Sequence, residues 1–595
     1  MIKEQMTLAI NDFLKGNHTA ALAQFESLLK KERNIDLLYN YGYILGELEL
    51  YEKEQKVYKL ILASSPNDIE TLINMSVSLN ATRNFSESIH YANKAIQINK
   101  EIHQAYEARG IAKIGIADIK GGIQDYKIWI NILLQDNKNI VLKTYLEDCL
   151  ELINLPPIYQ NEDEIENTRR DIQKKTDSLI ERLDHLTSAE LNVYKIGKKV
   201  AFKLKQFYLA YQQKNDRELN EKTIKILRKL LGDQEDKRIV QKTAKQKRKK
   251  LAILSTFQFH PKLFIFDQIA DIDRSKYEIE IIILNNKNFI TSDLDYHIEH
   301  HTFTAENYDE TIRKIKDKNY NVIFLPEIGM SIVSKILATE KLATITVTSW
   351  LHPITSGSDN VDIFLSGALM EKNNCHVHYT ENLVLLPGIG LKIDPKEYLV
   401  KKIKKIENES NPKKFIIGCI QTPFKYHPRM DKIFAKLAKA IPNSEFIFIR
   451  LQDEIDAKLI SRIRDNFQTN GLDAERIKIF DRMEKNQYKN FLSELDIAID
   501  SIGWSGGNTT LDLLGAGIPT LTIEEELMRA NHTAGIYKMI DINELIFKDE
   551  TNLIEAATEL STNPNKLIEM KKNLINKFSN LQTDSYISNF FNSLE

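Results

Sequence analysis

The sequence has few cysteines and no long apolar run. Its three cysteines, Cys149, Cys375 and Cys419, are far apart, so they can build neither a disulfide framework nor a zinc site of the C-x-x-C kind. No stretch reaches the roughly 20 apolar residues that span a bilayer. Residues 1–22 carry charges throughout and lack the apolar core of a signal peptide. We therefore expect a cytoplasmic protein without direct membrane insertion.

An excess of charge of one sign is also missing. The chain has 81 Lys and Arg against 83 Asp and Glu, a net charge of -2. This balance is typical of globular proteins and not of disordered or nucleic-acid-coating chains. The basic stretch KTAKQKRKK, residues 242–250, is interpreted as part of a solvated linker, and no nucleic-acid partner is expected.

The first part of the chain repeats with a period of 34 residues. Small residues at Gly42, Ser76 and Gly110 are followed in register by Tyr51, Phe85 and Ile119. Small residues let paired helices approach, and large ones fill the gap between neighbours. The period resembles the tetratricopeptide repeat, and we expect residues 1–135 to stack as helical hairpins whose concave face receives peptides. A solenoid used only for dimerisation or packing is the alternative.

The remainder of the chain changes character twice. Residues 136–248 have an irregular helical pattern and are interpreted as a helical connector. Short runs rich in β-branched residues then alternate with helix-compatible segments, which predicts parallel sheets built from βαβ units. The first series of such runs comprises LAILST, YEIEIIIL, YNVIFLP, ATITVTSW, VDIFLSG and ENLVLLP, and the second KKFIIGCI, SEFIFIRL, ERIKIFD, LDIAIDS and IPTLTI. We expect two Rossmann-like lobes at 249–400 and 401–565, and a C-terminal helix at 566–595 that packs across them.

One loop in the second lobe is suited to binding an anion. A strand ends at Ser501, a glycine-rich segment follows, and Asn508 opens a helix. Free backbone N–H groups and the positive end of the helix dipole form a site for a diphosphate. Asp512, one turn further on, can accept hydrogen bonds from ribose hydroxyls. The alternative is a well-capped helix with a glycine-rich entry loop.

Several ordered segments together resemble one family of transferases. They are SGGNTTLDLLGAGIP at 505–519, PEIGM at 326–330, WLHPITSGSDNVDIFLSG at 350–367 and KYHP at 425–428. These segments are similar to motifs of the O-GlcNAc transferases, the Spindly-type transferases and the bacterial adhesin N-glycosyltransferases, over about residues 250–580. Leu351 and His427 depart from the usual pattern. The resemblance implies that the two lobes adopt the GT-B fold and use a UDP-sugar donor, with no other cofactor and no metal.

The resemblance also implies roles for individual residues. Lys425 is expected to contact the donor diphosphate and stabilise charge on the leaving group. The expected donor-binding residues are Gln452, Lys485, Tyr488, Gly507, Asn508, Thr509, Thr510 and Asp512. Those expected near the acceptor or the sugar are His352, Pro353, Thr355, Gly329 and Thr422. His260, in the segment STFQFHPKLF, matches an H-P pair of the family, and the near-neutral pKa that is ordinary for histidine suits a group that positions or deprotonates the acceptor.

These observations predict an inverting, metal-independent glycosyltransferase. It would move GlcNAc or a hexose from a UDP-sugar to Ser/Thr or Asn side chains of a protein, with an oligomer possible. Two alternatives stay open: a non-catalytic repeat scaffold with a degenerate transferase module, and a transferase for glycan or lipid acceptors. The histidines of YHIEHH (296–301) and the D-x-D triplets at 271–273 and 293–295 are interpreted as chance mimics of metal sites.

Overall fold

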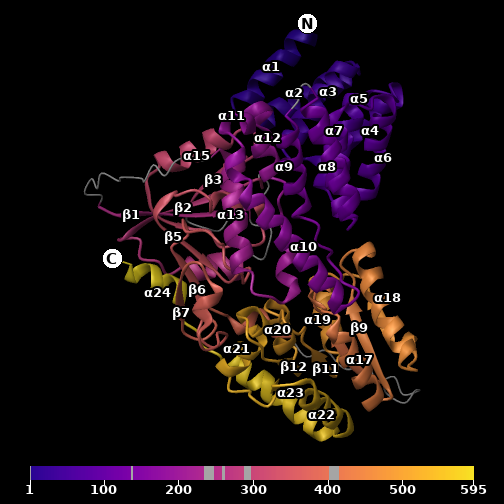
Figure 1. Cartoon of the computed structure of the whole chain (residues 1–595), viewed down its shortest axis with the longest axis vertical. Coiled ribbons are helices and arrows are strands. Elements are labelled where there is room, and N and C mark those ends of the chain that lie inside the picture. Colours follow the sequence, from indigo (N-terminus) through magenta and orange to yellow (C-terminus); the bar gives the residue numbers. More distant parts are fainter. Residues whose placement is uncertain are drawn as a thin grey trace. The chain divides into compact units, whose positions relative to one another are not determined.

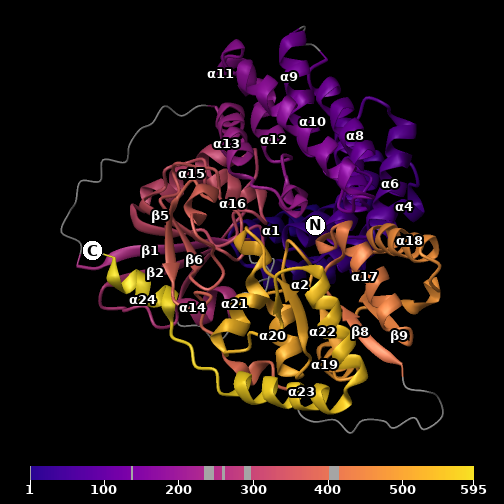
Figure 2. The same ribbon diagram turned by 60° about the horizontal axis from the view of Figure 1, so that its bottom comes forward.

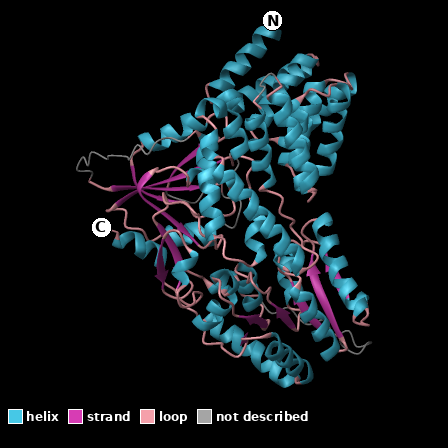
Figure 3. Ribbon diagram, in the orientation of Figure 1, coloured by secondary structure: helices cyan, strands magenta, loops and turns pink. Residues whose placement is uncertain are grey.

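The computed structural model divides into two compact units. It describes residues 2–135, 139–232, 247–256, 262–286, 296–400 and 414–594. The first unit runs to Asn154 and includes the short segment Asn192–Ile196, whereas the second holds most of the remaining chain from Leu155 onward. Figure 1 and Figure 2 colour the ribbon along the sequence, and Figure 3 shows that strands belong only to the second unit among the described residues.

The first unit consists of helices that pack as consecutive hairpins. They are α1 (Ile2–Leu14), α2 (His18–Lys31), α3 (Ile35–Glu47), α4 (Tyr51–Ser64), α5 (Ile69–Ala81), α6 (Phe85–Ile98), α7 (His103–Gly115), α8 (Ile119–Leu133) and α9 (Ile140–Glu151). The compact unit therefore extends past residue 135 and includes α9.

The small residues of the 34-residue period sit where paired helices come closest. A Cβ atom at Gly42 would lie 2.6 Å from the ring of Tyr58, and one at Gly110 would lie 2.6 Å from the ring of Tyr126. Ser76, at the same place in the middle repeat, shares a 2.8 Å hydrogen bond with a serine hydroxyl of the facing helix α6. The predicted helical repeats are confirmed, and the reason for their period is this close approach.

Two parallel sheets form the framework of the second unit. The first has the order β3-β2-β1-β4-β5-β6-β7 and the second β10-β9-β8-β11-β12-β13. The first sheet contains β1 (Lys249–Ser255), β2 (Tyr277–Leu284), β3 (His297–His301), β4 (Tyr320–Phe324), β5 (Ala343–Ser349), β6 (Ile363–Gly367) and β7 (Asn382–Leu386). The second contains β8 (Phe415–Cys419), β9 (Ser444–Ile449), β10 (Ile477–Phe480), β11 (Ile497–Ile499), β12 (Thr520–Ile523) and β13 (Ile546–Phe547). Every strand pair is parallel, which confirms the two expected α/β lobes.

The remaining helices cover these sheets or connect them to the repeats. They are α10 (Glu162–Glu181), α11 (Ser188–Asn192), α12 (Ile196–Ala201), α13 (Arg217–Leu231), α14 (Asp267–Ile269), α15 (Tyr308–Asp317), α16 (Ile332–Leu337), α17 (Arg429–Ala440), α18 (Asp453–Thr469), α19 (Lys485–Leu492), α20 (Asn508–Gly515), α21 (His532–Met539), α22 (Glu550–Thr562), α23 (Pro564–Ser579) and α24 (Tyr586–Ser593). None of the helices in the described residues is long and apolar enough to cross a membrane.

The end of the chain differs from its prediction as a single helix. The helices α23 and α24 are separated by a short non-helical segment, and α24 returns to the first lobe. The Tyr277 hydroxyl donates to the Phe591 carbonyl at 2.8 Å, and the Ser588 hydroxyl donates to the Gln268 carbonyl at 2.6 Å. The chain thus links the two lobes a second time.

Much of the segment expected to be a connector packs directly on both lobes. On the second lobe, the Arg462 guanidinium donates to the Tyr159 carbonyl at 2.6 Å. On the first lobe, the Asn220 side chain donates to the Thr355 carbonyl at 3.2 Å. Residues 155–191 and 197–232 are therefore built into the α/β unit and do not form a free linker.

The histidines of YHIEHH form an edge strand. His297 in β3 pairs with Glu280 in β2, and with Glu299 these residues place three potential metal ligands together. The Lys318 ammonium lies 2.8 Å from Glu280 and 2.6 Å from Glu299, so the chain supplies its own cation there. Of the two D-x-D triplets, the one at 293–295 lies outside the described residues.

Candidate functional site

The topology of the second sheet brings two loops of the predicted site together. Strands β8 and β11 are neighbours in the sheet. The chain continues from β8 to β9, toward one edge of the sheet, and from β11 to β12, toward the other edge. Ligands of open α/β sheets bind at such a switch point, beyond the carboxyl ends of the strands. The segment with Lys425 follows β8, and the loop that opens α20 follows β11. The two main features predicted for the donor site therefore meet at one place.

A cavity of about 440 Å³ lies at these strand ends. Its volume falls within the range of about 300–1,000 Å³ that is usual for small-molecule sites. Five of the residues predicted to contact the donor or the sugar line it: Thr422, Lys485, Tyr488, Asn508 and Asp512. They come from the loop after β8 and from helices α19 and α20, so segments nearly 90 residues apart share one wall.

Two buried polar atoms of this cavity lack an internal partner. The hydroxyl oxygen of Thr422 and the side-chain oxygen of Asn508 have no hydrogen bond among the described residues. An unsatisfied buried polar group costs about 1–3 kcal/mol, so native proteins usually pair such groups with the chain, water or a ligand. Both atoms therefore mark positions at which water or a polar ligand would be bound.

The start of α20 is open toward a ligand. A Cβ atom at Gly507, directly before the helix, would meet nothing within 4 Å, and Thr509 in the first turn is partly exposed. Thr510 differs from its neighbours, because its buried hydroxyl donates to the Gly506 carbonyl at 2.9 Å and pairs with Thr533. These hydrogen bonds stabilise the glycine loop, and the Thr510 side chain does not line the cavity. The free N–H groups of the first turn are left for an anion.

Asp512 lies among cationic neighbours on the same wall. Burial raises its pKa to about 6, and the charges of Lys489 and Lys485 act in the opposite direction. The same burial, together with Asp512, raises the pKa of Tyr488. Near neutral pH the carboxylate is mostly ionised and can accept hydrogen bonds from neutral hydroxyls. Lys489, which the sequence analysis did not single out, is held by the Glu397 carbonyl at 2.9 Å.

Lys425 joins the two loops. Its ammonium donates to the side-chain oxygen of Gln421 at 3.1 Å and to the carbonyl of Ser505 at 3.3 Å. Burial lowers the pKa of Lys425 to about 8, so the side chain is mostly protonated at neutral pH. An ammonium has three N–H donors. One of them binds Gln421 in the same loop and one binds Ser505 in the glycine loop, which leaves one for a ligand oxygen.

Gln452 takes a different place from the other donor-site candidates. It precedes helix α18, and its side-chain amide donates to Glu454 at 3.4 Å. Its neighbours Arg450 and Leu451 line the cavity in its stead, as does Arg482 after β10. The structure therefore adds two arginines near the donor cavity that the sequence analysis did not select.

The acceptor-side candidates gather in the loops after β4 and β5. His352 is buried, and a Cβ atom at Gly329 would lie 2.0 Å from its ring nitrogen, so the glycine leaves space for the imidazole. Burial, with smaller effects from nearby cations, lowers the pKa of His352 to about 3. Pro353 is buried beside it. The Thr355 hydroxyl donates a hydrogen bond to Glu381 at 2.7 Å, so this side chain stabilises the loop itself.

An aromatic cluster surrounds His352 and draws on three parts of the second unit. Phe207 and Tyr211 belong to the 3-10 helix Phe207–Gln212 that precedes α13, and Trp504 belongs to the glycine loop. The ring centres of Tyr211 and Trp504 are 4.3 Å apart, and His352 lies 5.1 Å from Trp504 and 5.4 Å from Phe207. Phe424, next to Lys425, packs 4.6 Å from Tyr211. The sequence analysis did not identify this cluster, since its members are distant in sequence.

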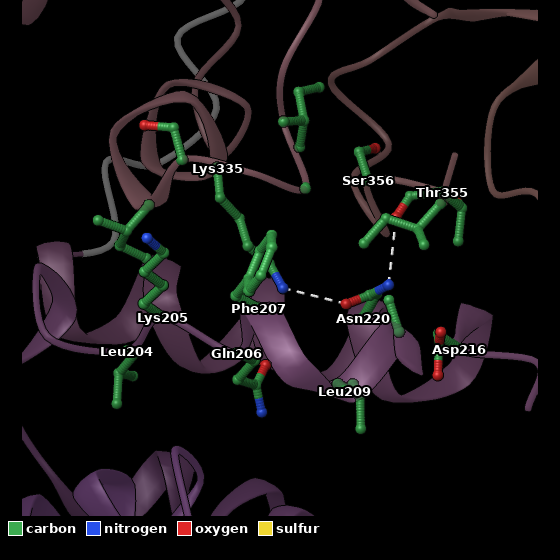
Figure 4. Close-up of a pocket in the computed structure, with 16 residues that line it drawn as sticks. Leu204, Lys205, Gln206, Phe207, Leu209, Asp216, Asn220, Lys335, Thr355 and Ser356 are labelled. Carbon is green, nitrogen blue, oxygen red and sulfur yellow. Dashed lines mark hydrogen bonds between the residues drawn. The ribbon is translucent and has the colours of Figure 1, made fainter. Parts of the chain in front are cut away.

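A second, much smaller cavity lies behind this cluster (Figure 4). Its volume of about 20 Å³ suits about one water molecule. The Lys335 ammonium donates to Asn220 at 3.0 Å, and Asn220 donates in turn to the Thr355 carbonyl. Burial lowers the pKa of Lys335 to about 8. This chain of hydrogen bonds fixes α13 to the loop after β5.

His260 lies outside the described residues. It follows β1, whose neighbours in the sheet are β2 and β4. Its role as a positioning group or base stays a prediction.

Comparison with known proteins places this site in a family. A model of glycosyl transferase family 41 matches residues 395–590. Residues 395–590 form a family 41 domain. This domain contains Lys425, Thr422 and the donor-site candidates, whereas the candidates at Gly329 and in the loop after β5 precede it.

Curated sequences are similar to part of this chain. The probable UDP-N-acetylglucosamine-peptide N-acetylglucosaminyltransferase SPINDLY of Solanum lycopersicum is 22% identical over 231 residues, which are 38% of this chain and 24% of that protein. The corresponding probable enzyme SEC of Arabidopsis thaliana is 24% identical over 242 residues, 39% of this chain and 24% of that protein. The matches thus span about a quarter of the length of these curated relatives.

A solved structure extends the likeness beyond the family 41 domain. A mutant of the O-GlcNAc transferase of Thermobaculum terrenum superposes with a TM-score of 0.59 and 15% sequence identity, covering 94% of this chain and 95% of that one. The likeness shows the fold: helical repeats followed by the two lobes of a GT-B module.

Proposed function

We propose that this chain is a glycosyltransferase that moves GlcNAc from UDP-GlcNAc to side chains of a protein. The family 41 domain and the names of its relatives support this reaction class. The observation that carries the proposal is the cavity lined by the start of α20 and by two unpartnered polar atoms, with Lys425 bonded to its lining residue Gln421. A nucleoside diphosphate would supply negative oxygens for the cation and the helix N–H groups, and polar partners for the two unpaired atoms.

The donor fits the cavity group by group. The diphosphate would lie against the N–H groups of α20 and the third N–H of Lys425, since both are positive and face negative oxygens. The ribose hydroxyls would donate to Asp512. Asn508 and Thr422 would meet the polar atoms of the phosphates or the sugar. The uracil would lie near Tyr488 and Lys485.

We propose a single displacement with inversion at the sugar. A hydroxyl oxygen or an amide nitrogen of the acceptor attacks the anomeric carbon, and the bond from that carbon to the β-phosphate oxygen breaks. UDP leaves with the electron pair, and its new charge is stabilised by Lys425 and the helix end, in the place that a metal takes in other transferases. The acceptor loses its proton, for which His260 is the candidate recipient. The acceptor would reach the site with help from the concave face of the repeats.

A donor assay with protein acceptors tests this proposal. Radiolabelled UDP-GlcNAc is incubated with the full chain and a set of candidate proteins, in parallel with a Lys425→Ala variant and with EDTA present. We expect label in protein from wild type only, unaffected by EDTA. Mass spectrometry of the labelled protein then reads the sugar mass and the linked atom, and so separates GlcNAc from hexose and Ser/Thr from Asn.

The two alternatives give different results in the same assay. A non-catalytic scaffold would bind UDP without any transfer or hydrolysis. A transferase for glycans or lipids would label those acceptors and leave proteins unlabelled. Loss of activity with EDTA would contradict the metal-independent mechanism.

A further inference from the structure

Asp500 is a buried carboxylate at the base of the donor site, directly after β11. Its side chain is 2% exposed. One oxygen accepts the backbone N–H groups of Ser501 and Gly506, both at 2.9 Å. The other accepts the hydroxyls of Ser505 at 2.5 Å and Thr522 at 2.9 Å. A carboxylate has about four acceptor positions, and the chain occupies all of them, so Asp500 is available neither as a base nor as a metal ligand.

Ser505 links this carboxylate to Lys425. The serine hydroxyl donates to Asp500, whereas its carbonyl accepts the Lys425 ammonium at 3.3 Å. The imidazole nitrogen of His532 lies 3.3 Å from the same carbonyl. The Asp500 carboxylate and the Lys425 ammonium are therefore both bonded to Ser505, one to its hydroxyl and the other to its carbonyl.

The two histidines on which the Lys425 charge acts are neutral. Burial lowers the pKa values of His352, after β5, and of His532, in α21, to about 3. Gln421, the second partner of the lysine, carries no charge. Desolvation lowers the pKa of Lys425, and Asp500 acts against this effect. Among these groups Asp500 alone favours the ammonium form.

We propose that Asp500 is a positioning residue of the transferase. It holds the glycine loop in the shape that receives the donor diphosphate, and through Ser505 it keeps Lys425 in place and protonated. This inference rests on the proposed function, because it takes the diphosphate of UDP as the ligand of Lys425.

The substitution Asp500→Asn removes the charge and keeps the shape. The amide oxygen can still accept the two backbone N–H groups, and the amide nitrogen can donate to the hydroxyls of Ser505 and Thr522, which rotate freely enough to accept. The loop is therefore expected to fold as before. Thr522→Val is the matched control, since it removes one hydrogen bond from the same carboxylate and leaves the charge.

The readout is the affinity of the full chain for UDP between pH 7 and 9.5, measured by titration calorimetry. Above about pH 7 the terminal phosphate of UDP is mostly ionised, so a loss of affinity with rising pH reports Lys425. In wild type we expect this loss near pH 8. Losing an opposite charge shifts a pKa by at least about one unit, so the Asp500→Asn variant should lose affinity near pH 7 and bind about fivefold more weakly at pH 8.

Each outcome separates this inference from the proposed function. A wild type that binds no UDP at any pH refutes the proposed donor. A wild type that binds UDP, with an unmoved profile in Asp500→Asn, refutes the role of Asp500. An equal shift in Thr522→Val refutes it as well, because that variant retains the charge. Lys425→Arg should remove the loss near pH 8, since arginine stays protonated.

A second variant covers the case in which Asp500→Asn does not fold. Ser505→Ala removes the hydroxyl hydrogen bond from the loop to the carboxylate, leaves the backbone N–H bonds of Ser501 and Gly506, and retains the Asp500 charge. We expect UDP binding several-fold weaker at every pH, with the loss of affinity still near pH 8. Wild-type affinity in Ser505→Ala would overturn the proposed link from Asp500 through Ser505 to Lys425.

Discussion

Lys425 is the side chain whose removal should affect the reaction most. Its ammonium has two partners in the chain, at 3.1 Å and 3.3 Å, and one N–H left for the donor. With a pKa of about 8, it is about nine-tenths protonated at pH 7. Lys425→Met keeps much of the length of the side chain and removes the charge.

The expected loss can be estimated from the role of the ammonium. Removing one preorganised group that stabilises transition-state charge costs about 10²–10³ in kcat, or about 2.7–4 kcal/mol. Initial rates of GlcNAc transfer at saturating UDP-GlcNAc and pH 7 measure this loss. Lys432→Met is the control, because Lys432 is an exposed lysine of α17, with 68% of its side chain accessible, outside the cavity lining. The control should keep the wild-type rate.

Two results would refute this reasoning. A folded Lys425→Met protein with more than a tenth of the wild-type kcat would show that the ammonium does not stabilise the leaving group. A variant that changes only KM, with kcat intact, would show that Lys425 binds the donor equally in ground and transition states.

Three further substitutions test the site and the fold. Asp512→Asn should raise the unfolding free energy of the free protein by about 1–2 kcal/mol at pH 7 and weaken UDP binding. The pKa of Asp512 is raised to about 6 in the folded protein, so the folded state loses stability as the pH rises from about 4 to 6, and the amide avoids this loss. Equal melting temperatures at pH 7, or a difference that persists at pH 4, would contradict this. Gly503→Ala should lower Tm, because a Cβ atom there would lie 1.9 Å from the Gln213 side chain. The φ of +80° at Gly503 also adds a left-handed backbone strain of about 1 kcal/mol or more. Gly507→Ala, where a Cβ atom would meet nothing within 4 Å, is the control and should melt as wild type does. Gly110→Ala should destabilise the repeats by about 1–3 kcal/mol, read from the helical circular dichroism signal on heating, since the new methyl group would press on Tyr126; an unchanged melting curve would show that the hairpin relaxes without cost.

The sequence predicted the regular parts of this fold well. The 34-residue period reports a helix contact that tolerates only a small residue, so it is visible in the chain itself. Central parallel strands are buried on both faces and therefore appear as continuous apolar runs. The edge strand His297–His301 has only exposed and half-buried residues, and Ile546–Phe547 is two residues long, so neither produces such a run.

The candidate site was predictable where one segment carries its own chemistry. The glycine loop and the start of α20 are contiguous, and their pattern alone indicates an anion site. Tyr211 acts through partners far away in sequence. The role of Asp500 depends on how the glycine loop folds back onto its carboxylate, which no motif encodes. The side-chain directions of Thr510 and Gln452 depend on packing and on a neighbouring carboxylate, which a motif does not encode.

The connector limits how this chain can be divided for experiments. A fragment that began at residue 249 would contain both sheets and the whole family 41 domain, yet it would lack Tyr211, Asn220 and the Tyr159 carbonyl. Trp504 and His352 would then face water, and the guanidinium of Arg462 would lose one of its acceptors. A recombinant catalytic piece should therefore start near Leu155, where the second compact unit begins.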